Sequence, residues 1–126
     1  MMNGATYSQG SIVLVPFPFT DLSTRKERPA LVVSPNWFNH CYQDRVLTGI
    51  TSSTSGNITE RKNITIDIEP DDMKEGRIHK RSIVKLTKIF TCSEDIIIRK
   101  VAHLKEEKLS EVLEKLRDFF SEQTTG

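Results

Sequence analysis

The sequence predicts a mainly β domain of the α+β class, in which a small, partly closed antiparallel β-barrel carries a long C-terminal α-helix. Short apolar, β-branched runs recur between turn-rich segments over most of the chain. A helical period is confined to the C-terminal part. A length of 126 residues, with 37% hydrophobic and 28% charged side chains, suits a single domain with one modest core. We expect that domain to span residues 1–126, with residues 1–9 as a flexible N terminus.

Apolar runs bounded by proline predict the first two strands. Residues 11–17 form the first run, and a polar loop over residues 20–28 follows. The second run, residues 30–33, begins directly after Pro29 and stops before Pro35. Because proline is tolerated at the first residue of a strand and not in its middle, we expect the second strand to start here.

Four more strands are expected in the middle of the chain. In one of them isoleucines alternate with polar residues, the pattern of a strand with one buried face. Turn-rich segments separate the strands, most clearly residues 52–62 with their serines, threonines and glycine. The expected strands are residues 45–51, 63–68, 82–86 and 95–101.

The last element has a helical period. Apolar residues recur at steps of three and four, which indicates an amphipathic helix that packs one stripe on the core. Lys105 stands where a serine or aspartate cap is expected, so the helix has a poor N-cap. The stripe consists of Leu104, Leu109, Val112, Leu113, Leu116, Phe119 and Phe120.

Several classes of protein find no support in the sequence. The first ten residues are polar and do not form a secretory signal, and no apolar run reaches the roughly 18 residues of a membrane span, so we expect a cytoplasmic protein without membrane contact. Cys41 and Cys92 lack zinc-site spacing and are expected to be free thiols. There is no GxSxG, HExxH or glycine-rich phosphate loop.

Charge is unevenly distributed despite a formal net charge of +1. Residues 76–88 hold arginines and lysines without a carboxylate, which favours a polyanionic partner. Residues 67–75 are acidic and are expected to be a solvated loop.

His79, inside the basic stretch, is the histidine most suited to contact a substrate. His40 and His103 are far from it in sequence, and a lone histidine is more often a surface or satisfied residue.

Other cationic side chains fall in or beside predicted loops, and loops at one end of a small barrel can share a face. A cationic groove of this kind suits phosphodiester chemistry, because guanidinium groups hold phosphate oxygens in bidentate pairs. Ordinary solvated loop charge is an equally good explanation from composition alone. The side chains are Lys26, Arg28, Arg61, Lys62, Arg77, Lys80 and Arg81.

Three segments together resemble MazF/PemK-type toxins. The segment GSIVLVPFPFTDLSTRKERPALVVS, residues 10–34, resembles the family's glycine-led first strand, charged loop and Arg-Pro-apolar second strand. LTGITSS, residues 47–53, resembles the end of its third strand, and RSIVKLTKIFT, residues 81–91, resembles a later strand. The PFPF segment looks more like the PemK-like subgroup, so the cleavage sequence is left open.

The resemblance implies an SH3-like barrel, usually a homodimer, that cleaves single-stranded mRNA without cofactor or metal and is silenced by a cognate antitoxin. The family's catalytic arginine and threonine fall on Arg28 and Thr51, with Ser52 as an alternative hydroxyl. The expected RNA-binding residues are Arg25, Lys26, Ser52, Arg61, Lys62, His79, Lys80 and Arg81.

Each of these assignments has a structural alternative. Arg28 can end a strand or pair with Glu27, and threonine is common at strand ends in any case. Trp37, Phe38 and Tyr42 follow the second strand at near-helical spacing. They suit either base stacking or packing in a core or dimer contact.

Two rival functions stay open. The first is a non-enzymatic, protein-binding toxin like the gyrase poison CcdB, although the tail SEQTTG does not resemble the CcdB site. The second is a homologue that binds RNA or antitoxin and has lost catalysis.

Overall fold

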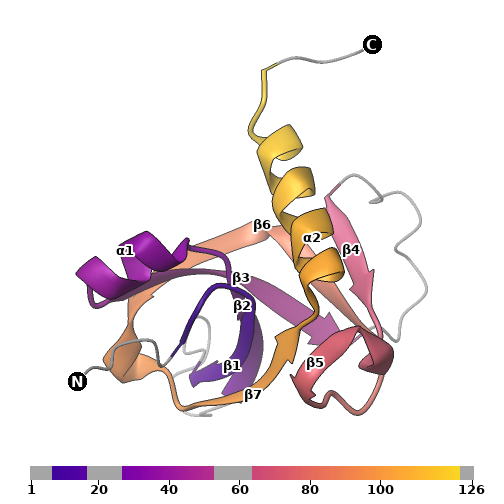
Figure 1. Ribbon diagram of the computed structural model, residues 1–126, viewed down its shortest axis with the longest axis horizontal. Helices are drawn as coiled ribbons and strands as arrows, with labels where there is room; N and C mark the ends of the chain where they lie inside the picture. Colours follow the sequence, from indigo (N-terminus) through magenta and orange to yellow (C-terminus); the bar gives the residue numbers. More distant parts are fainter. Residues whose placement is uncertain (1–6, 17–26, 53–63, 123–126) are drawn as a thin grey trace.

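The computed structural model describes residues 7–16, 27–52 and 64–122. Within these ranges seven strands form one antiparallel sheet in the order β4-β6-β3-β2-β1-β7-β5, and the C-terminal helix α2 packs across it (Figure 1). The predicted mainly β fold with a helical cover is therefore confirmed. The strands are β1 Ser11–Pro16, β2 Glu27–Val32, β3 Asp44–Ser52, β4 Thr65–Ile68, β5 Met73–Gly76, β6 Ser82–Ser93 and β7 Arg99–Leu104. The helices are α1 Asn36–Cys41 and α2 Glu106–Phe119, and the 3-10 turns are η2 Pro70–Asp72 and η3 Glu94–Ile96.

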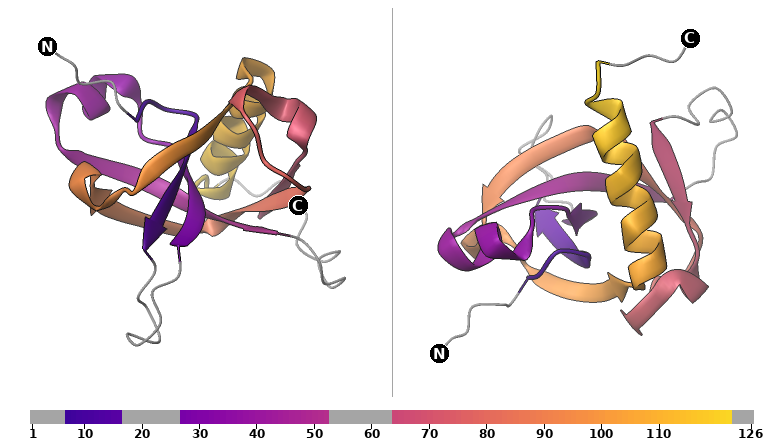
Figure 2. Two further views of the ribbon diagram at one scale, coloured as in Figure 1. Left: turned by 90° about the horizontal axis from the view of Figure 1, so that it is seen from below. Right: turned by 45° about the horizontal axis from the view of Figure 1, so that its top comes forward.

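The order of the strands explains why the sheet curls. β4 and β5 form its two edges, yet only Glu69 and η2 separate them in sequence. A segment this short spans little distance, so the two edges must approach each other. The sheet consequently bends into the partly closed barrel seen in both views of Figure 2.

Side chains on the two faces of the sheet form two apolar clusters. Along β1, Ile12 belongs to the cluster beneath α2, whereas Val13 and Val15 belong to the cluster on the other face. α2 contributes Val112 and Leu116 to the first cluster, as its helical period predicts. The second cluster includes Ala30 and Val32 of β2, Leu47 of β3 and Ile97; we call its side of the sheet the inner face.

Arg45 on β3 is fully buried and joins three parts of the chain. Its guanidinium donates to the carbonyl oxygens of Tyr7, Tyr42 and Asp44, each at 3.0 Å, and to the Glu94 carboxylate at 3.0 Å. These bonds attach the N-terminal segment, the end of α1 and η3 to the barrel.

β6 is the longest strand of the described part and pairs along all of β3. A large bulge interrupts the pairing of the two strands. Thr48 pairs with Ile89 and Ile50 pairs with Val84, so residues 85–88 have only Gly49 opposite them. The Thr48 hydroxyl donates to the Lys85 carbonyl and satisfies an oxygen that the bulge leaves out of the ladder. The sequence predicts a strand only over residues 82–86, whereas β6 continues beyond the bulge to Ser93.

Several other element boundaries differ from the prediction. Residues 95–101 were expected to be a strand, but Ser93 accepts a hydrogen bond from the Asp95 amide and begins η3, so β7 starts only at Arg99. β2 begins at Glu27 rather than after Pro29. Its pairing with β3 starts at Ala30, so Pro29 occupies an edge position where proline is tolerated.

Three further elements depart from the expected pattern. The acidic stretch contains β5, where Met73 is buried and Gly76 (φ +66°) lies so close to β7 that an added Cβ would be 2.1 Å from the Val101 carbonyl oxygen. α1 forms over the aromatic segment that showed near-helical spacing. Leu104 ends β7, and the helix starts at Glu106 with Lys105 as a cap that makes no side-chain bond.

Residues 7–9, expected to belong to a flexible N terminus, are held against the barrel. The Gln9 amide donates to Asn36 Oδ1 and its side chain donates to the Val33 carbonyl, both at 2.8 Å. Residues 1–6, the rest of that expected segment, lie outside the described residues.

Candidate functional site

Arg28 and Thr51 lie at the same level of two neighbouring strands. The register of β2 with β3 pairs Ala30 with Gly49. Arg28 and Thr51 are each two residues beyond this pair, and both strands extend past them. The ladder between the two strands ends at this pair, and continuing its register by two residues sets Arg28 opposite Thr51.

Both side chains belong to the inner face of the sheet. Alternate residues of a strand share a face, so Arg28 is on the side of Ala30, and Thr51 is on the side of Leu47. Arg28 is exposed and Thr51 is half-buried, at the end of the cluster. Ser52 is exposed and follows Thr51 directly, so it belongs to the opposite face. The geometry thus favours Thr51 over Ser52 as the hydroxyl beside Arg28.

Arg28 forms no ion pair with any carboxylate that the structure describes. The pairing with Glu27 considered from sequence is therefore not present, although the two residues are adjacent in β2. An exposed guanidinium beside a hydroxyl can donate several hydrogen bonds to an anion with tetrahedral oxygens, such as a phosphate.

The basic stretch enters the same region through the start of β6. Ser82 pairs with Ser52, so the exposed residues His79 and Lys80 precede a strand that lies directly beside Thr51. Arg81 differs from them because its guanidinium contacts Asp67 at 2.6 Å and Glu69 at 3.5 Å. The hydrogen bond and charge of Asp67 raise the pKa of Arg81 above its usual range.

The acidic stretch therefore neutralises one of the predicted RNA-binding residues. Arg25, Lys26, Arg61 and Lys62, which were also predicted to bind RNA, lie outside the described residues.

The aromatic cluster on α1 is at the other end of β2. Trp37 and Phe38 pack edge to face with ring centroids 6.0 Å apart, and Phe38 lies 4.8 Å from Tyr42. Trp37 and Tyr42 are 68% and 57% exposed. α1 follows the C-terminal end of β2, whereas Arg28 is near its N-terminal end. The cluster is thus not part of the site around Arg28.

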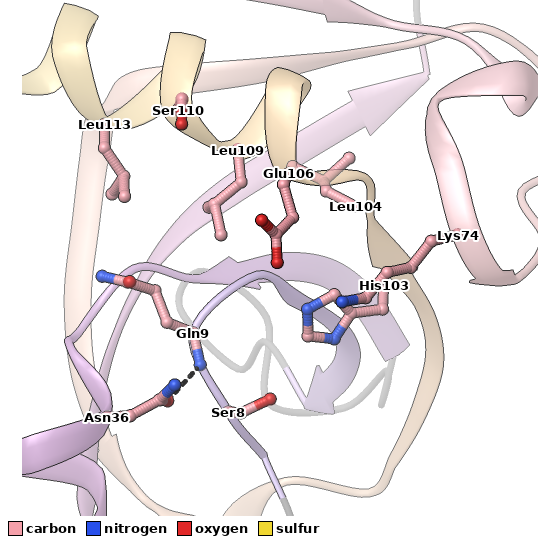
Figure 3. Close-up of a pocket in the computed structure, with 10 residues that line it drawn as sticks. All are labelled: Ser8, Gln9, Asn36, Lys74, His103, Leu104, Glu106, Leu109, Ser110 and Leu113. Atoms are coloured by element: carbon pink, nitrogen blue, oxygen red, sulfur yellow. Dashed lines mark hydrogen bonds between the residues drawn. The ribbon is translucent and has the colours of Figure 1, made fainter.

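A cavity of about 380 Å³ lies between α2, the end of β7 and residues 8–9 (Figure 3). His103 and Glu106 point into it, with Lys74 at its side. Burial, with the nearby charges of Lys100 and Lys74, lowers the pKa of His103 and favours its neutral form. The cavity adjoins the start of β1, whereas Arg28 pairs with Val15 near the end of that strand. The two places are therefore separate.

The cysteines and acidic residues add no further catalytic set to the described chain. Cys41 is exposed, Cys92 is half-buried, and both are free thiols. Burial raises the pKa of Cys92, which disfavours its reactive thiolate. Within residues 7–16, 27–52 and 64–122, no three His, Cys, Asp or Glu side chains come together as metal ligands. None of the helices described is long and apolar enough to cross a membrane.

Comparisons with known proteins agree on one family. The model of the PemK-like, MazF-like toxins of type II toxin–antitoxin systems matches residues 8–120. No curated protein matches the chain by sequence.

Solved structures share the fold at low sequence identity. An endoribonuclease from a mycobacterial species, in complex with its cognate antitoxin, has a TM-score of 0.70 at 14% identity over 93% of this chain and 97% of that one. A MazE–MazF structure from Deinococcus radiodurans has a TM-score of 0.69 at 19% identity over 94% and 98% of the two chains. A second mycobacterial endoribonuclease has a TM-score of 0.66 at 16% identity over 94% and 92%.

Proposed function

Because the chain belongs to the PemK-like, MazF-like toxin family of type II toxin–antitoxin systems, we propose that it is a toxin that cleaves single-stranded RNA without a metal ion. The observation that carries the proposal is the placement of Arg28 and Thr51 two residues beyond the same cross-strand pair, on one face of the sheet. Solved structures with this fold include proteins named as endoribonucleases, which supports the same activity here.

The reaction uses the nucleophile that RNA itself carries. The 2′-hydroxyl attacks its own phosphorus, the bond to the 5′-oxygen breaks, and the products are a 2′,3′-cyclic phosphate and a 5′-hydroxyl. Solvent water accepts the proton of the 2′-hydroxyl, and the departing 5′-oxygen takes a proton from water. The protein therefore has to align the attacking oxygen with the leaving oxygen and stabilise the charge on the phosphorane.

We assign separate roles to the two residues. The Arg28 guanidinium donates to the non-bridging oxygens and stabilises the negative charge that builds on them. An arginine keeps its proton at ordinary pH, so Arg28 does not act as a free general base. The Thr51 hydroxyl hydrogen-bonds the same phosphate and orients it.

The proposal extends to partners and location. A cognate antitoxin would bind the toxin and cover its RNA groove, in keeping with the antitoxin complexes among the structures of similar fold. We further propose a homodimer that acts on mRNA in the cytoplasm. His79 and Lys80, next to the strand beside Thr51, would guide the RNA backbone together with Arg25, Lys26, Arg61 and Lys62. Arg81, paired with Asp67, and Ser52, on the opposite face, are left out of this groove.

The experiment that tests this proposal is incubation of the purified protein with a long single-stranded RNA and with DNA of the same sequence, both in EDTA. We expect discrete RNA fragments and intact DNA, because DNA lacks the 2′-hydroxyl. Intact RNA across varied sequences would contradict the proposal and favour a protein-binding toxin or an inactive homologue. Cleavage of both polymers would contradict the proposed chemistry.

A further inference from the structure

The β6 bulge brings Lys88 against the middle of β3. A Cβ added to Gly49 would lie 3.4 Å from the Lys88 Cβ and 3.9 Å from its carbonyl oxygen. Since glycine has no side chain, the base of Lys88 rests directly over the backbone of β3 at this point. A Cβ at position 49 would be in ordinary van der Waals contact with Lys88.

Lys88 consequently lies on the face that carries Arg28 and Thr51. The Gly49 Cβ direction is that of Leu47 and Thr51, because alternate residues of β3 share a face. Two residues of strand separate Gly49 from Thr51, a distance of about 6.6 Å. Lys88 is exposed, and its four-carbon stem is long enough to bring the ammonium group to the surroundings of Thr51.

The charge of Lys88 is available for a ligand. Arg81 is paired with Asp67, and Lys100 contacts Glu75 at 3.1 Å. In the described part of the chain no carboxylate pairs with Lys88. An exposed lysine beside a phosphate-binding arginine adds a second donor for the same polyanion.

We propose that Lys88 binds the RNA backbone at a phosphate beside the one that is cleaved, and so holds the strand in register with Arg28 and Thr51. This inference rests on the proposed ribonuclease function. Lys88 contributes to binding and alignment, and the phosphorane charge is left to Arg28. Removing the Lys88 side chain therefore affects KM more than kcat.

The test measures RNA binding against salt concentration for wild type and for Lys88→Met. The probe is a 2′-O-methyl RNA that contains a sequence cleaved by the wild type, because it lacks the nucleophile and stays intact. One phosphate contact in a single strand contributes about 0.7 to the slope of log K against log salt. We expect Lys88→Met to lower the slope by that amount, to raise KM about tenfold for cleavable RNA and to leave kcat within about twofold.

Two variants serve as controls. Lys88→Arg keeps the charge and is expected to retain the wild-type slope. Lys105→Met removes another exposed lysine, at the cap of α2, and is expected to change neither slope nor KM. If the wild type binds and cleaves while Lys88→Met matches it in slope and KM, the inference is overturned and the proposed function stands. If the wild type neither binds nor cleaves RNA, both are overturned.

Discussion

At the scale of single residues, Arg28 is the side chain on which the chemistry depends most. Arg28→Ala should lower single-turnover cleavage about 100-fold or more, the usual loss for one contact to a developing oxyanion. The fold should be kept because the side chain is exposed.

The matched control is Arg99→Ala. Arg99 is also exposed and pairs with Leu14 of β1, whereas Arg28 pairs with the next residue, Val15. Because adjacent residues of a strand point to opposite faces, Arg99 and Arg28 lie on opposite faces of the sheet. Equal rates for wild type and Arg28→Ala would remove Arg28 from the site.

Thr51 and Ser52 are adjacent hydroxyls that the strand directs to opposite faces. Thr51→Val removes the hydroxyl and keeps the shape of the side chain, so cleavage should fall about tenfold, the effect of a lost hydrogen bond to a charged group. Ser52→Ala should have the smaller effect. The same kinetic assay compares them, and a greater loss for Ser52→Ala would reverse the assignment.

His103 links stability to pH. Burial lowers its pKa in the folded protein, so near and below the ordinary value of 6.5 the unfolded chain binds more protons. The free energy of unfolding should therefore fall as pH decreases through 6.5 toward the lowered pKa. The charges that act on His103 are Lys74, Lys100, Glu75 and Glu106.

Urea unfolding between about pH 7.5 and 5.5 checks this expectation, with His103→Gln as the comparison. The variant should lose less stability over this range than the wild type. A wild type and a variant with parallel pH profiles would show that His103 is not responsible.

At the scale of elements, Arg45 holds together segments that are far apart in sequence. Arg45→Ala leaves three backbone carbonyls and Glu94 without their donor, and we expect a loss of about 3 kcal/mol in the free energy of unfolding. The Arg45→Lys variant lacks a forked donor group and should restore only part of this stability. Chemical denaturation measures both, and an Arg45→Ala protein as stable as wild type would contradict this role.

Helices and strands that have a regular pattern of apolar residues could be predicted from the sequence. Strands that form only because they pair with a distant strand could not. The apolar run of β1 and the stripe of α2 are local signals, and the structure confirms the run of β1. In α2 the stripe buries Val112 and Leu116, whereas Phe119 and Phe120, which were predicted to continue the stripe, are 39% and 67% exposed because the helix ends beyond the cluster. β5 has one buried apolar residue, Met73, and forms because β7 pairs with it. Gly76 was the available signal, since its close approach to β7 admits no side chain.

The same distinction applies to the site. Residue types and a family resemblance selected Arg28 and Thr51, but their adjacency depends on the β2–β3 register, which no local pattern encodes. The partners of Arg81 and the position of Lys88 also depend on long-range pairing, because they follow from β4–β6 contact and from the β6 bulge.

At the scale of the whole molecule, the curled sheet separates three surfaces. Arg28 lies near the start of β2 and Thr51 near the end of the neighbouring strand β3, and α1 follows the other end of β2. The cavity at His103 lies beside α2 (Figure 3). Strand ends and loops at one end of a barrel can therefore evolve toward a polyanion without disturbing the two apolar clusters.

The most direct test of the central claim is cleavage, in EDTA, of an RNA oligonucleotide in which the nucleotide before the cleaved bond carries a single 2′-deoxy substitution. We expect this bond alone to become resistant. The unmodified oligonucleotide should yield a 2′,3′-cyclic phosphate and a 5′-hydroxyl, as read by mass spectrometry. Continued cleavage at the substituted position, or a 5′-phosphate product, would show that water rather than the 2′-hydroxyl attacks the phosphorus.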